Sequence, residues 1–130
     1  MPIVKNKSIC FSINTINQAE FILKEFNKKT QIIFYIKNYL IKGFGVDWLI
    51  NFRYLLKKKS KSINFKIYVD AGFDSGLCIK LVQNNFNYIK IKSNVLIINK
   101  LKQIAKKNKV LLNPRFRVVD IKKFKITNKK

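Results

Sequence analysis

The sequence predicts one α/β domain built on a mainly parallel five-stranded sheet, and two observations carry this prediction. Short runs rich in Ile, Val, Phe and Tyr alternate with longer segments whose apolar residues recur at helical spacing. The runs are also nearly evenly spaced along the chain, which is typical of repeated βα units. We expect a doubly wound, flavodoxin-like sheet. A half-barrel-like βα array is the alternative, and it ranks second because an isolated half barrel leaves its sheet edges unpaired.

Each expected strand is a short run bounded by Asn, Lys, Gly or Pro. The five runs are residues 8–13, 31–36, 64–70, 87–91 and 110–112. The unit that starts at the second run is ten residues longer than the others, and the surplus maps to residues 37–46. We place the domain at residues 1–115. Residues 116–130 form a basic C-terminal extension, which adds an edge strand or stays loose, with its last residues disordered.

The expected helices lie between these runs and carry apolar stripes on one side. They are residues 15–28, 47–60, 74–86 and 94–109. Residues that favour helix N-caps stand at the start of each segment. These residues are Asn14 or Thr15, Asp47, Asp74 and Asn94.

The composition excludes several kinds of chemistry. The chain has no histidine, which removes histidine general bases, histidine-dependent nucleophiles and histidine metal ligands. The two cysteines, Cys10 and Cys78, have no partners at metal-ligand spacing and suggest reduced thiols in a cytoplasmic protein. No uninterrupted run of apolar residues is long enough for a membrane span. We therefore expect no membrane partner, no metal and no cofactor.

The net charge of +22 has two interpretations. Only Arg53, Arg115 and Arg117 are arginines, and all the other cations among the 28 basic residues are lysines. Lys, Asn, Ile and Phe have A/T-rich codons, so the charge fits an AT-biased genome and a solvated surface. A domain selected for phosphate recognition would use more Arg, whose planar fork binds phosphate in bidentate fashion. A polyanionic partner remains the alternative source of the charge.

In a parallel sheet, ligands bind beyond the carboxyl ends of the strands. We call the segments that follow the expected strands the carboxyl-end rim: residues 14–15, 37–46, 71–75, 92–94 and 113–115. The most specific feature there is Val69-Asp70-Ala71-Gly72-Phe73-Asp74-Ser75-Gly76, which holds two of the four glycines. It has three interpretations: a tight turn with a helix cap, an anion site at a helix N-terminus, or a carboxylate pair for Mg²⁺ or acid–base work.

The candidate residues follow from these interpretations. The candidate catalytic residues are Asp70 and Asp74. The candidate ligand-binding residues are Asp70, Gly72, Asp74, Ser75, Gly76, Lys37, Lys42, Ser93 and Arg115. In the long segment after the second strand, Tyr39, Phe44 and Trp48 could form an aromatic and basic lip that stacks a base. The favoured alternative is a hydrophobic lid or a short extra helix.

The order of elements over residues 8–115 is similar to that of receiver domains of two-component signalling. The resemblance places Asp70 at the family's phosphorylated aspartate and Ser93 near its conserved hydroxyl residue. Two positions differ: Asn113-Pro114 stands where the family has Lys-Pro, and Ile13-Asn14-Thr15 lacks the family's acidic pair. The resemblance implies a degenerate receiver-like domain, and residues 70–93 also look like the phosphate-binding turns of some βα barrels.

Three functions follow from the sequence. The leading one is a non-catalytic interaction or structural module with a ligand site on the carboxyl-end rim. The second is RNA or other nucleic-acid binding through the Lys-rich helices and the basic C-terminal extension, where Phe116 lies between two arginines. The candidate residues for it are Arg115, Arg117, Lys122, Lys123 and Lys125. The third is a carboxylate- or Mg²⁺-dependent enzyme centred on Asp70.

Overall fold

The computed structural model describes residues 8–26, 30–59 and 64–121. Six strands form one sheet in which every neighbouring pair is parallel. The strands are β1 (Ser8–Ile13), β2 (Gln31–Ile36), β3 (Phe65–Asp70), β4 (Tyr88–Lys90), β5 (Leu111–Leu112) and β6 (Val118–Asp120). The prediction of an α/β fold with a mainly parallel sheet is therefore confirmed, with six strands in place of five. The sixth strand comes from the C-terminal extension and pairs with β1.

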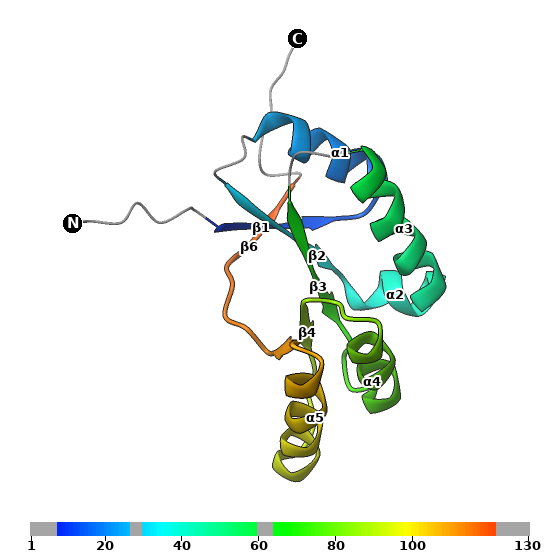
Figure 1. Ribbon diagram of the computed structural model, residues 1–130, viewed down its shortest axis with the longest axis vertical. Helices are drawn as coiled ribbons and strands as arrows, with labels where there is room; N and C mark the ends of the chain where they lie inside the picture. The colour runs from blue at the N-terminus through cyan, green and yellow to red at the C-terminus, as the bar shows by residue number, and fades with distance from the viewer. Residues whose placement is uncertain (1–7, 27–29, 60–63, 122–130) are drawn as a thin grey trace, which may run out of the picture.

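The strand order is β5-β4-β3-β2-β1-β6. From β1 to β5 each new strand is added beside the last one, always in the same direction (Figure 1). In a doubly wound sheet, the direction in which successive strands are added reverses at a switch point. The prediction of that order is therefore wrong, and the order from β1 to β5 is that of the alternative βα array. Alternation of strands and helices is the same in both arrangements, so the sequence pattern could not separate them.

Five helices connect the strands: α1 (Ile16–Glu25), α2 (Asn38–Phe44), α3 (Val46–Lys59), α4 (Ser75–Gln83) and α5 (Val95–Lys107). Because βαβ crossovers are right-handed, a chain that always steps the same way leaves every helix on the same face of the sheet. One core cluster agrees with this: Ile22 of α1, Leu49 of α3, Leu81 of α4 and Leu101 of α5 share it with alternate strand residues such as Phe34. In Figure 1 the helices accordingly follow one side of a curved sheet.

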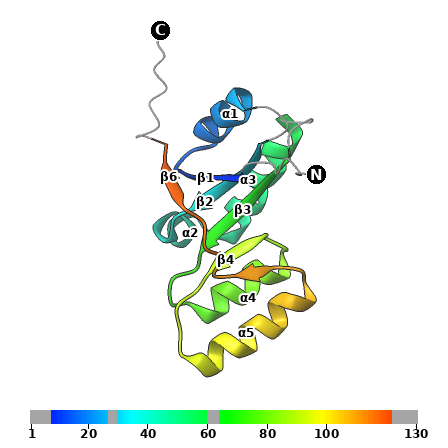
Figure 2. The ribbon, with the colours of Figure 1, turned by 90° about the vertical axis from the view of Figure 1, so that its left-hand side faces the viewer.

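The other face of the sheet carries no helix. Its centre is a small buried cluster of Cys10, Ile33 and Tyr68. The link between β5 and β6 crosses this face, in front of the sheet in Figure 2. Phe116 of the link packs edge-on against Tyr68 and Tyr88, with ring centroids 5.9 and 4.8 Å apart. We call this surface the helix-free face. Through Phe116, the link covers the rings of Tyr68 and Tyr88, which would be exposed on a sheet with helices on one face only.

Both edges of the sheet are very short. The edge strand β5 has two residues and the edge strand β6 has three. Short edge strands offer few free backbone groups to another chain. The half-barrel-like array ranked second because its edges would stay unpaired, and edges this short leave few backbone groups unpaired.

The helix boundaries follow from capping. Thr15 caps α1 in a capping box with Gln18, and Asp74 and Asn94 accept hydrogen bonds from the first turns of α4 and α5, as predicted. The predicted cap at Asp47 is wrong because α3 already begins at Val46, which places Asp47 in its first turn. The reason is α2: residues 38–44 form the short extra helix, and α3 follows it directly after Gly45.

Candidate functional site

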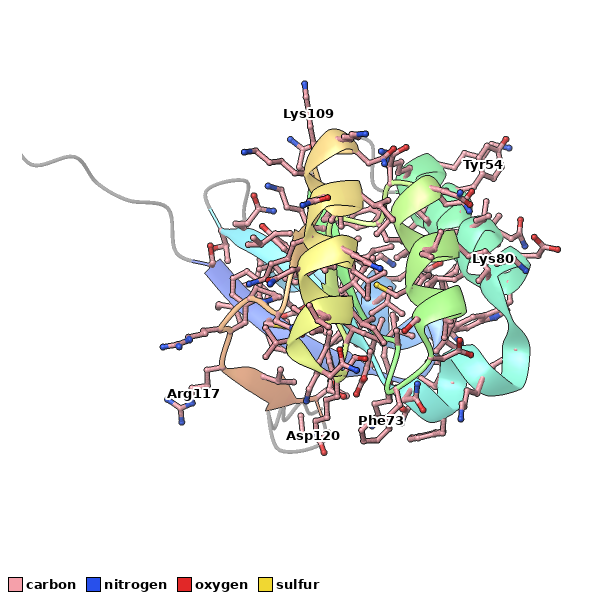
Figure 3. The ribbon with its side chains drawn as sticks, turned by 90° about the horizontal axis from the view of Figure 1, so that it is seen from below. Tyr54, Phe73, Lys80, Lys109, Arg117 and Asp120 are labelled. Carbon is pink, nitrogen blue, oxygen red and sulfur yellow. The ribbon has the colours of Figure 1, made fainter. Side chains whose placement is uncertain are left out.

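The carboxyl ends of the strands meet at one edge of the sheet, as the parallel order requires. The segments after β2, β3 and β4 are adjacent there: Nδ2 of Asn38 donates to the Asp70 carbonyl oxygen at 2.9 Å, and the Lys92 N–H donates to the Gly72 carbonyl oxygen at 2.8 Å. Figure 3 shows Phe73 at this edge and Lys109 at the opposite end of the molecule. The predicted rim is therefore a continuous surface, and the candidate residues on it can be placed one by one.

Asp70 ends β3 and faces the helix-free side. Its Oδ2 accepts a hydrogen bond from the Tyr35 hydroxyl at 2.8 Å, and its Oδ1 accepts one from the Gly72 backbone N–H at 2.9 Å. Both carboxylate oxygens thus hold neighbouring parts of the protein. Burial, the hydrogen bond to Asp70 and its negative charge together raise the pKa of Tyr35, so this phenol stays protonated and keeps donating.

Gly72 is required by the turn after Asp70. Its φ is +65°, a backbone conformation that residues with a Cβ atom rarely adopt. An added Cβ would also lie only 2.9 Å from Nδ2 of Asn38. Asn38, at the start of α2, donates a 2.9 Å hydrogen bond to the Asp70 carbonyl oxygen. These contacts fix α2 to the end of β3 and support the tight-turn interpretation of this segment.

The remaining residues of the segment form the start of α4. The Asp74 carboxylate accepts a hydrogen bond from the Leu77 N–H at 3.0 Å, and Ser75 is the first helical residue. This internal carboxylate occupies the position where an external anion would bind the helix amides. Gly76 is not needed for close packing, because an added Cβ would approach only Asp74, at an ordinary contact distance of 3.5 Å.

A pocket of about 510 Å³ lies beside this helix start, on the helix side of the rim. Lys42, Asp74 and Gly76 line it together with Lys80 of α4. The structure therefore brings three of the candidate ligand-binding residues together here.

Lys37 lies apart from this pocket, at the end of β2. Its Nζ donates to Oδ1 of Asn14 at 3.1 Å and stands 5.8 Å from the centre of the Tyr39 ring. The Tyr39 hydroxyl donates to the same Asn14 oxygen at 3.3 Å. Ser93 is exposed in the loop after β4. The candidates thus divide between two sides of the rim and do not form one compact site.

Carboxylate chemistry has little support in this arrangement. Asp70 and Asp74 each hold backbone groups of their own turns. In the described parts of the chain, no three His, Cys, Asp or Glu side chains come together as a metal site. Burial raises the pKa of the Cys10 thiol to about 12 and that of Cys78 to about 11, which suppresses the nucleophilic thiolate form.

The most unusual property of the rim is its exposed apolar side chains. Among the described large hydrophobic residues, the five most exposed are 60–79% accessible, and all five lie on the segments that follow β2, β3 and β4. We call them the apolar rim cluster: Tyr39, Phe44, Phe73, Val95 and Leu96. Single exposed apolar residues are ordinary on protein surfaces, whereas a concentration of them at one edge is typical of binding surfaces and makes this edge the candidate site.

Lysines lie among the members of this cluster. Lys92 stands 6.0 Å from the centre of the Phe73 ring, and Lys42 is an exposed residue of α2, between Tyr39 and Phe44. Phe44 stacks on Trp48 at 4.9 Å between ring centroids, so one face of its ring is covered while the side chain stays accessible. The Trp48 ring therefore supports the exposed Phe44 ring from one side.

The residues proposed for nucleic-acid contact are only partly described. Arg115 and Arg117 are exposed on the link between β5 and β6, whereas Phe116 turns inward onto the helix-free face. Its ring is therefore engaged and does not stack a base alongside the two arginines. Lys122, Lys123 and Lys125 lie outside the described residues.

The sequence reasoning missed several residues that build the rim. Tyr35 and Asn38 carried no local signal, because their partners are distant in the sequence. Val95 and Leu96 did carry one: both stand in the first turn of an amphipathic helix, outside its apolar stripe. Phe73 precedes the Asp74 cap and is 79% exposed, so it does not fold back as a hydrophobic staple.

Fold and rim together define a singly wound α/β protein with an apolar and basic surface at the carboxyl ends of its strands. No known protein-family model matches the chain, and a comparison with curated proteins finds no similar sequence. None of the helices in the described residues has the length and apolar character that a membrane span needs. Functional inference therefore depends on the rim itself.

Proposed function

We propose that the protein is a small non-catalytic binding module that uses the carboxyl-end rim to hold a partner. The observation that carries this proposal is the apolar rim cluster, whose five members are the most exposed of the described large hydrophobic residues. Exposed apolar surface is costly in water, and its concentration at one edge is explained by a partner that covers it. The engaged carboxylates of Asp70 and Asp74 support a non-catalytic role.

The cytoplasm is the proposed location. Cys10 and Cys78 are both buried free thiols, which suits a reducing compartment. The large lysine excess is attributed to an AT-biased genome acting on a solvated surface.

Nucleic-acid binding is the second candidate. It is favoured by the exposed Arg115 and Arg117 and by the exposed lysines of α5, which lie away from its buried stripe. Those lysines are Lys100, Lys102, Lys106 and Lys107. This function predicts RNA binding that weakens steeply with salt and that weakens further when both arginines are replaced.

Photo-crosslinking in cells tests the leading proposal, because it captures a partner whose identity has not been assumed. Benzoylphenylalanine is placed at Phe73 and, as a matched control, at Tyr54 of α3, which is 58% exposed and lies away from the rim (Figure 3). The proposal predicts adducts at position 73 well above those at position 54. Equal yields at the two positions would contradict it.

A further inference from the structure

We propose that the partner of the rim is the surface of an anionic lipid bilayer, into which the apolar rim cluster inserts without any helix crossing the membrane. This inference rests on the proposed function and names its partner. It departs from the expectation of no membrane partner, which came from the lack of a spanning segment. A spanning segment is recognised as one long apolar run, and five residues on three separate segments form no such run.

The chemistry of the cluster is the first argument. Val95 and Leu96 are 74% exposed and have no aromatic face. Base stacking, which needs aromatic planes, leaves these two side chains unexplained. A bilayer interface takes aliphatic and aromatic side chains together, because its driving force is the removal of apolar area from water.

The lysines around the cluster are the second argument. Lys37, Lys42 and Lys92 lie on the same segments as the apolar residues. Lysine is depleted at protein–protein interfaces, whereas near a bilayer its long side chain reaches from the apolar layer to the phosphate level.

Four described carboxylates lie at or near this edge. Asp70 and Asp74 are engaged in hydrogen bonds within their own turns. Asp47 is exposed in the first turn of α3 and Asp120 ends β6, so the lysines must outweigh these charges.

Charge complementarity is the third argument. The chain carries a net charge of +22, and anionic lipids attract lysines close to the membrane surface. Attraction brings the protein to the bilayer, but it acts on every face that carries lysine. The apolar rim cluster is what would select one orientation, with the carboxyl ends of the strands towards the lipid.

The rim is also rigid enough to present these side chains together. Asn38 fixes α2 to the end of β3, and the backbone N–H of Lys92 bonds to the Gly72 carbonyl oxygen at 2.8 Å. The segments carrying Tyr39, Phe73 and Leu96 are therefore connected, and little ordering is needed when a flat surface contacts them.

The test is co-sedimentation of the full chain with vesicles of phosphatidylcholine containing about 30% phosphatidylglycerol. The variant Phe73→Ser/Leu96→Ser removes two inserted side chains and leaves the charge unchanged. We expect its partition into these vesicles to fall by at least about tenfold, since complete burial of one such side chain is worth about that factor. The control variant Tyr54→Ser should stay within about twofold of the wild type. Circular dichroism checks that each variant is folded.

The outcomes separate the inference from the function on which it rests. Equal partition of the rim variant and the wild type would overturn the inference, because charge alone would then explain adsorption. Failure of the wild type to bind the anionic vesicles would overturn it as well. If crosslinks at position 73 then lead to RNA or protein, the membrane inference fails while the binding module stands.

A spectroscopic measurement tests insertion independently. In a Trp48→Phe background, which removes the single tryptophan, Phe73→Trp places a reporter at the rim. Its emission should shift to the blue and be quenched by lipids brominated near the headgroup. Unshifted, unquenched emission from vesicle-bound protein would contradict insertion.

Discussion

Replacement of Gly72 by alanine tests the connection between α2 and the end of β3. The left-handed backbone at φ +65° costs a residue with a Cβ atom roughly 1–2 kcal/mol relative to glycine. The new methyl group would lie 2.9 Å from Nδ2 of Asn38 and would displace that amide from the Asp70 carbonyl oxygen. Loss of this hydrogen bond adds about 1 kcal/mol. We expect Gly72→Ala to lower the free energy of unfolding by roughly 2–3 kcal/mol, or the melting temperature by about 10 °C.

Urea unfolding followed by circular dichroism measures this loss, and two further variants make it specific. Gly43→Ala is the matched control: Gly43 lies in α2, an added Cβ meets nothing within 4 Å, and we expect a gain of about 0.5–1 kcal/mol. In an Asn38→Ala background the clash is absent, so Gly72→Ala should cost only the backbone part, roughly 1–2 kcal/mol. An equal cost in both backgrounds, or a cost below about 0.5 kcal/mol, would refute the reasoning.

Three further predictions concern the helix-free face and the buried thiols. The Ser12 hydroxyl is buried and has no hydrogen-bond partner in the described part of the chain, so Ser12→Ala should leave the stability unchanged or raise it; a loss above about 1 kcal/mol on thermal melting would contradict this. Burial, followed by the nearby Cys10 and Asp70, raises the pKa of Tyr68 to about 12 from an ordinary 10.0, so the folded state holds this proton longer than the unfolded state. Stability should therefore fall between pH 10 and 12, and urea midpoints across this range should show a smaller fall for Tyr68→Phe. Cys10 and Cys78 should react with iodoacetamide at pH 8 only after unfolding, as followed by mass spectrometry; fast labelling of the native protein would contradict their burial.

The local parts of the fold could be predicted because their signals lie in short stretches of sequence. The first two strands were predicted at the residues where they occur, and the caps at Thr15, Asp74 and Asn94 followed from side chains that bond backbone groups three residues away. The prediction of a helix cap at Asp47 was wrong because α3 follows α2 so closely that it already begins at Val46.

The strand order could not be predicted, because it depends on which strands meet in three dimensions. The same alternation of strands and helices serves doubly and singly wound sheets. The turn at Gly72 was predictable from its composition, whereas the contacts that use it, from Tyr35 and Asn38, join residues more than 30 positions apart. The apolar rim cluster was predicted only in part: Tyr39 and Phe44 were placed in an aromatic and basic lip, as one of two alternatives. Phe73, Val95 and Leu96 were not connected with them, because these residues belong to separate segments that only the sheet brings together.

Interstrand nuclear Overhauser effects test most directly whether consecutive parallel strands bring their carboxyl ends to one rim. We expect backbone contacts of Tyr35 in β2 with both Ser12 in β1 and Tyr68 in β3, and of Ser12 with Asp120 in β6. Contacts that pair Ser12 directly with Tyr68, as in a doubly wound sheet with β1 beside β3, would contradict the strand order and remove the helix-free face.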